Sequence, residues 1–72
     1  MKDPELVQFG QQLKEIRQEL GISQEQFAFE SGLSRSYISD VERGARNPTL
    51  KKLLLIQRTL GVDIADLFQW VA

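Results

Sequence analysis

Four polar side chains fall at a spacing that places them on one face of a helix near the middle of the chain. They are Arg35, Ser36, Ser39 and Asp40. On a helix over 35–43, Ile38 and Val41 occupy the opposite face. A guanidinium donates two hydrogen bonds to guanine O6 and N7, and small hydroxyl and carboxylate groups reach other base edges. The chemistry that this face predicts is hydrogen bonding in the major groove of double-stranded DNA.

A second short helix is predicted directly before the first. Ser23 is a good N-cap for a helix over 24–31, and Gln26 completes a capping-box pattern. Gly32 ends this helix, and Ser34 caps the next one. Two short helices joined by a tight turn are the helix-turn-helix arrangement.

Three further helices are predicted to support this pair. Asp3 and Pro4 begin a helix with an apolar stripe, Thr49 caps another, and Asp63 opens a short last one. No stretch alternates as a strand does. The sequence therefore predicts an all-α, five-helix fold in one domain over 1–72. Its helices are expected at about 4–20, 24–31, 35–43, 50–60 and 64–69.

Composition excludes several functions. The 72 residues include neither Cys nor His, so disulfides, Cys/His metal sites and a histidine general base are absent. We expect no enzyme, metal, cofactor or small-molecule ligand. No apolar run approaches the ~18–20 residues that span a bilayer, and residues 1–5 lack the form of a signal peptide. We therefore expect a cytoplasmic protein.

The basic charge is concentrated in one stretch, although the formal net charge is −1. Residues 34–52 hold five basic residues and two acidic ones: Arg35, Arg43, Arg46, Lys51 and Lys52 against Asp40 and Glu42. Lys51 and Lys52 stand in the first turn of a predicted helix, where the macrodipole disfavours cations by ~0.3–1 kcal/mol. Breaking this local rule indicates a phosphate partner, with surface solubility as the alternative.

Several motifs together resemble the phage repressor/Cro-type helix-turn-helix family. They are SQEQFA (23–28), GLSRSYIS (32–39), VERG (41–44), RNPTL (46–50) and LGVD (60–63). The resemblance spans residues 6–68, and RSYI (35–38) with Arg46 and Asn47 is most similar to controller proteins of restriction–modification systems. It implies a compact lambda-repressor-like fold and a transcriptional regulator. Such a regulator binds a palindromic DNA operator as a homodimer.

The resemblance also implies roles for individual residues. Arg35, Ser36, Ser39 and Asp40 are expected to contact bases, with Asp40 either accepting from cytosine N4 or excluding wrong bases. The residues expected to contact phosphates are Ser23, Gln24, Ser34, Tyr37, Arg43, Arg46, Asn47, Lys51 and Lys52. The alternative for these polar groups is an ordinary solvated surface, and for Tyr37 it is partial packing in the core.

Two further expectations concern structure. The family pairs a helix-one arginine with an acid near the end of the recognition helix, and here these are Arg17 and Glu42. At the other end, Phe68, Trp70 and Val71 are expected to form a dimer interface, while Trp70 folded back on its own core is the alternative. A rival function is a protein-binding adaptor or antitoxin with the same fold, which the negative net charge favours.

Overall fold

The computed structural model describes residues 3–71, so Met1, Lys2 and Ala72 of the predicted domain lie outside it. Within that range every regular element is a helix, and no strand is present. The elements are α1 (Pro4–Glu19), α2 (Gln24–Ser31), α3 (Arg35–Glu42), α4 (Leu50–Leu60) and the 3-10 helix η1 (Ile64–Phe68). The all-helical prediction is confirmed. The last element is a 3-10 helix, and α1, α3 and η1 each end one residue earlier than predicted.

Side-chain oxygens begin the two helices of the central pair. The Ser23 hydroxyl accepts a hydrogen bond from the Gln26 amide at 3.0 Å, and the Ser34 hydroxyl accepts one from the Tyr37 amide at 3.0 Å. Between them, Gly32 has a φ of 76°, the left-handed conformation that glycine adopts without steric cost. Together they fix where α2 begins and ends and where α3 begins.

The core draws on all five elements. Its fully buried side chains are Leu13 from α1, Phe27 from α2, Ile38 and Val41 from α3, Ile56 from α4 and Leu67 from η1. The apolar face predicted for α3 therefore lies in the core. Burial of a large aliphatic or aromatic side chain contributes about 1.5–3 kcal/mol, so these residues hold α3 firmly against the other helices.

A glycine lets α1 approach the end of α3. A Cβ placed on Gly10 would lie 2.5 Å from the carbonyl oxygen of Glu42 and closer still to that of Val41. The two backbones therefore touch at a point where no side chain fits. This contact sets the position of α3 on α1.

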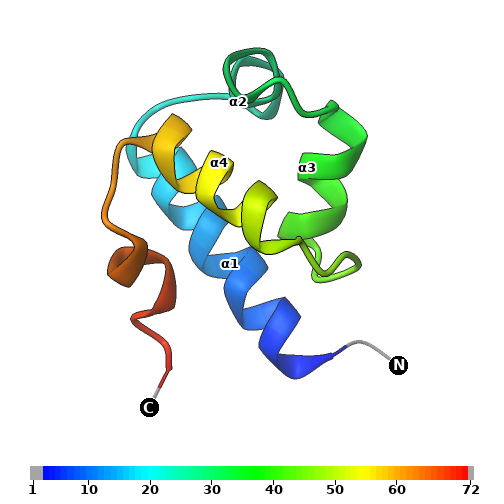
Figure 1. Ribbon diagram of the computed structural model, residues 1–72, viewed down its shortest axis with the longest axis vertical. Helices are drawn as coiled ribbons and strands as arrows, with labels where there is room; N and C mark the ends of the chain where they lie inside the picture. Colours follow the sequence, from blue (N-terminus) through cyan, green and yellow to red (C-terminus); the bar gives the residue numbers. More distant parts are fainter. Residues whose placement is uncertain (1–2, 72) are drawn as a thin grey trace.

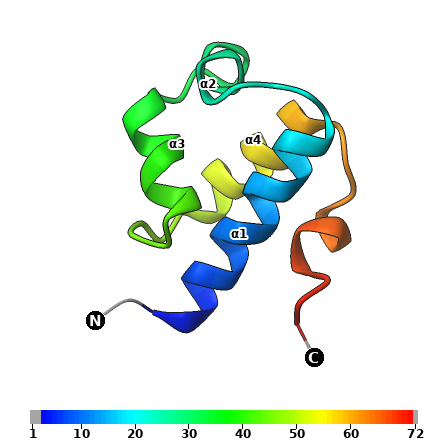
Figure 2. The same cartoon turned by 180° about the vertical axis from the view of Figure 1, so that it is seen from behind.

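α3 and the C-terminal segment lie on opposite sides of the molecule. α3 packs against α1 and α2, whereas η1 packs against α1 and α4 (Figures 1 and 2). The outer face of α3 is therefore left open on one side. Among the described residues, no helix is long and apolar enough to cross a membrane.

Candidate nucleic-acid interface

The outer face of α3 carries the four predicted base-contacting residues. Arg35 and Ser36 are exposed, and Ser39 and Asp40 are half-buried. Together with Gln24 and Arg43, they line an open hollow of about 330 Å³. The structure thus gathers these side chains on one accessible surface, the hollow of α3.

The Arg35 side chain forms an ion pair on this surface. Its Nη1 donates to Glu25 Oε1 of α2 at 2.6 Å, although both side chains are well exposed. Sequence reasoning did not find this pair, because ten residues separate the partners and only the angle between α2 and α3 brings them together.

Asp40 is bound by two arginines. Oδ1 accepts a hydrogen bond from Arg43 Nη2, and Oδ2 lies 3.3 Å from Arg46 Nη2. These hydrogen bonds, first from Arg43 and then from Arg46, hold the pKa of the Asp40 carboxyl below its ordinary value. Both carboxylate oxygens are therefore engaged within the protein. From the sequence, Asp40 is expected either to accept from cytosine N4 or to exclude wrong bases, and neither expectation includes these contacts with arginines.

Tyr37 of α3 contacts the loop after α3 and the start of α4. Its side chain is only 8% exposed, so partial packing in the core is what the structure shows. The Arg46 guanidinium carbon lies 5.1 Å from the ring centroid and the Lys52 ammonium nitrogen 4.5 Å from it, both within cation–π range. Burial raises the pKa of the Tyr37 phenol, and the charge of Arg46 partly opposes the rise.

Arg17 and Glu42 form a buried ion pair beneath this surface. Arg17 Nε lies 2.7 Å from Glu42 Oε2, and Nη2 lies 3.1 Å from Oε1. Arg17 Nη1 also donates to the Ile22 carbonyl at 2.8 Å, while Gln24 Nε2 donates to Glu42 Oε1 at 2.9 Å. The network connects α1, the loop before α2, the start of α2 and the end of α3.

The remaining predicted phosphate contacts surround α3. Asn47 is exposed in the loop before α4, and Lys51 and Lys52 are exposed in the first turn of α4. The Gln24 amide is already bound to Glu42, so any phosphate contact by this residue uses its other donors. The Ser23 and Ser34 hydroxyls accept capping bonds and still hold a proton to donate.

The C-terminal aromatic residues fold back on the core. The Phe68 ring lies 5.5 Å from the Phe9 ring and 6.1 Å from the Trp70 ring, measured between centroids. Trp70 Nε1 donates to the Leu67 carbonyl at 2.9 Å, which agrees with the folded-back alternative. Val71 remains 55% exposed.

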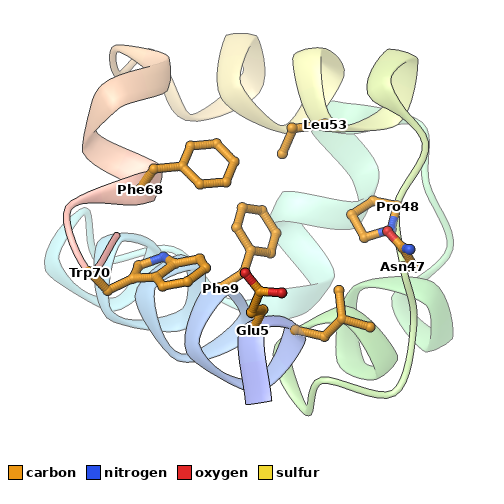
Figure 3. Close-up of a pocket in the computed structure, with 8 residues that line it drawn as sticks. Glu5, Phe9, Asn47, Pro48, Leu53, Phe68 and Trp70 are labelled. Carbon is orange, nitrogen blue, oxygen red and sulfur yellow. The ribbon is translucent and has the colours of Figure 1, made fainter. Parts of the chain in front are cut away.

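An open apolar groove runs beside these aromatic residues. It measures about 240 Å³ and reaches from Phe68 and Trp70 past Phe9 to Pro48 (Figure 3). Asn47, at its far end, lies in the loop predicted to contact phosphates. The described residues contain no group of three or more carboxylates that would hold a metal ion.

The comparisons with known proteins agree with this architecture. The profile of a family described as Helix-turn-helix matches residues 13–67. Control protein C.BamHI of Bacillus amyloliquefaciens is 46% identical over 63 residues, which cover 86% of this chain and 78% of its own length.

Two solved structures are similar as well. The restriction–modification controller protein C.AhdI from Aeromonas hydrophila has a TM-score of 0.89 and 47% identity, covering 92% of this chain and all of that one. The C.Esp1396I controller protein, solved as a tetramer with its natural 35 base-pair operator, has a TM-score of 0.86 and 39% identity, over 96% and 91% of the two chains. This chain belongs to the helix-turn-helix family, and restriction–modification controller proteins are among the members similar to it over nearly its whole length.

Proposed function

We propose that this protein is a sequence-specific DNA-binding regulator that controls restriction–modification genes from a palindromic operator. The observation that carries the proposal is the hollow of α3, a polar helix face whose neighbouring loop and helix carry basic side chains. Its support from relatives is that C.Esp1396I, a controller protein 39% identical to this chain, was solved with its operator. Relatives of this kind are regulators, so we propose no catalytic activity.

In the proposed complex, α3 enters the major groove with its N-terminal end toward the bases. Arg35 reads a guanine, and Ser36 and Ser39 contact neighbouring base edges. Asp40 either meets cytosine N4 or acts through the arginines that it holds, and an amide at this position separates the two roles. The phosphate contacts come from the starts of α2, α3 and α4, from Tyr37 and Arg43, and from the loop after α3, and they fix the register.

The dimer is proposed to form through the C-terminal side. Half-site centres lie about 34–36 Å apart on DNA, whereas one protomer measures only 29 × 24 × 22 Å. The two α3 helices must therefore lie on the outer parts of the two protomers. Since η1 lies on the opposite side from α3 (Figure 1), a contact through the exposed Val71 and the parts of Phe68 and Trp70 that the core leaves uncovered meets this requirement.

A protein-binding adaptor or antitoxin remains the rival, because the net charge of the chain is −1. The two functions differ in their response to salt. Contacts with phosphates release counterions, so the affinity for DNA falls steeply as salt rises. An apolar protein interface does not weaken in this way.

Selection of bound sites from a random DNA pool tests the proposal directly. A recovered palindrome with half-sites one helical turn apart supports it, and a pool without enriched sequence overturns it. With the recovered operator, Arg35→Ala should weaken specific binding by ~1–3 kcal/mol and relax the preference at one base pair. An unchanged preference in Arg35→Ala removes Arg35 from base reading.

A further inference from the structure

The ion pair between α2 and α3 has a consequence for how bases are read. We propose that Glu25 is a positioning residue, which aims the Arg35 guanidinium at its base and thereby sets the discrimination at that base pair. The inference rests on the proposed function, in which Arg35 reads a guanine.

The geometry of the pair leaves Arg35 able to bind a base. Glu25 stands in the first turn of α2, and Arg35 is the first residue of α3. The carboxylate engages only Nη1, at 2.6 Å, and Arg35 donates no other side-chain hydrogen bond within residues 3–71. Nε and Nη2 therefore remain as donors for guanine O6 and N7.

Stability does not account for the pair. The Arg35 and Glu25 side chains are 61% and 74% exposed, and an ion pair between such exposed groups contributes little to folding. Affinity for phosphates does not account for it either, because a carboxylate beside the DNA face repels the backbone. The pair does restrict the long Arg35 side chain to fewer rotamers.

Restricting the rotamers of Arg35 favours its contact with a base and no other contact with DNA. A free arginine loses several rotamers when it binds a base, and an arginine already held by a carboxylate loses fewer. Contacts with phosphates made by other residues do not depend on this restriction. Glu25 therefore strengthens base reading while it weakens binding to DNA in general.

These opposite effects give the proposal a distinctive test. In Glu25→Ala, we expect the preference for operator over an operator changed at the Arg35 base pair to fall by about two- to fivefold. Affinity for unrelated duplex DNA should rise, since one negative charge is lost. Glu25→Gln keeps an oxygen that accepts from Arg35 and should recover part of the preference.

Glu30→Ala is the matched control. Glu30 is an exposed carboxylate on the same helix and forms no ion pair within the described residues. The Glu30→Ala variant should bind unrelated DNA more tightly than the wild-type protein does, with the same base preference. Glu25→Ala in an Arg35→Ala background should likewise leave base preference unchanged, because the side chain that it positions is gone.

The outcomes distinguish this inference from the proposed function. If Arg35→Ala relaxes the base preference while Glu25→Ala behaves like Glu30→Ala, Glu25 does not position Arg35 and the inference is overturned. If Arg35→Ala leaves the preference unchanged, the assignment of Arg35 fails and the inference fails with it. Loss of preference in Glu25→Ala that persists in the Arg35→Ala background would also overturn it.

Discussion

Removing Arg17 tests how the buried ion pair holds α3 in place. Replacement by Met keeps most of the side-chain volume but removes three hydrogen bonds, two to Glu42 and one to the Ile22 carbonyl. Glu42, whose side chain is 2% exposed, would keep only the bond from Gln24. Leaving a buried charge without its partner costs about 3–5 kcal/mol.

That loss is large for a chain of this size. A protein of 72 residues has a stability of roughly 4–11 kcal/mol, taking about 0.05–0.15 kcal/mol per residue. Each kcal/mol shifts Tm by about 4–8 °C in a domain of this length. We therefore expect Arg17→Met to lower Tm by roughly 12–40 °C. Part of the population should then be unfolded at about 37 °C.

Urea unfolding followed by circular dichroism and by fluorescence of the single tryptophan measures the effect. The double variant Arg17→Met/Glu42→Leu leaves no unpaired buried charge and should be more stable than Arg17→Met alone. Arg58→Met is the surface control, because Arg58 is exposed on α4, and it should change the stability by less than about 0.5 kcal/mol. If Arg17→Met costs no more than Arg58→Met, the network does not fix α3.

Three other predictions follow from the structure. Lys52→Ala should weaken binding to all DNA sequences alike and reduce the slope of log K against log salt by about 0.9, whereas Lys14→Ala on α1 should not. Gly10→Ala should destabilise the fold by about 1–3 kcal/mol in urea unfolding, because its Cβ would meet the backbone of α3, and an unchanged midpoint would contradict that close approach. The only tyrosine, Tyr37, should titrate above pH ~10 by ultraviolet absorbance. Since folding raises this pKa, its contribution to stability is complete below pH ~10 and is lost as pH rises through the folded value.

Local signals were sufficient to predict most of the fold. Each side-chain N-cap involves groups within three residues of one another, as Ser34 and the Tyr37 amide show, so sequence spacing identifies it. Local signals did not predict that the C-terminal element, Ile64–Phe68, is a 3-10 helix. A segment of five residues is too short for its own hydrogen bonds to select an α-helix, and packing of Leu67 and Phe68 decides its form.

The sequence indicated which side chains gather on the outer face of α3 and that Arg17 pairs with Glu42, but it did not indicate the ion pairs of Arg35 and Asp40. Asp40 and Arg43 stand three apart on a helix, so their contact was within reach of sequence reasoning. The contact from Arg46 to Asp40 requires the loop after α3 to fold back, and that from Glu25 to Arg35 requires the angle between two helices. Neither geometry is encoded in local spacing.

The pairing explains how an acidic chain presents a surface suited to DNA. Glu25 of α2 and both acids of α3 are matched with arginines: Glu25 with Arg35, Asp40 with Arg43 and Arg46, and Glu42 with Arg17. Glu42 is buried with its partner and has little influence at the surface. Lys51 and Lys52 add two exposed ammonium groups, neither of which is in an ion pair within residues 3–71. The charges on and around α3 therefore sum to a positive value, which favours a positive local potential whatever the net charge of the molecule.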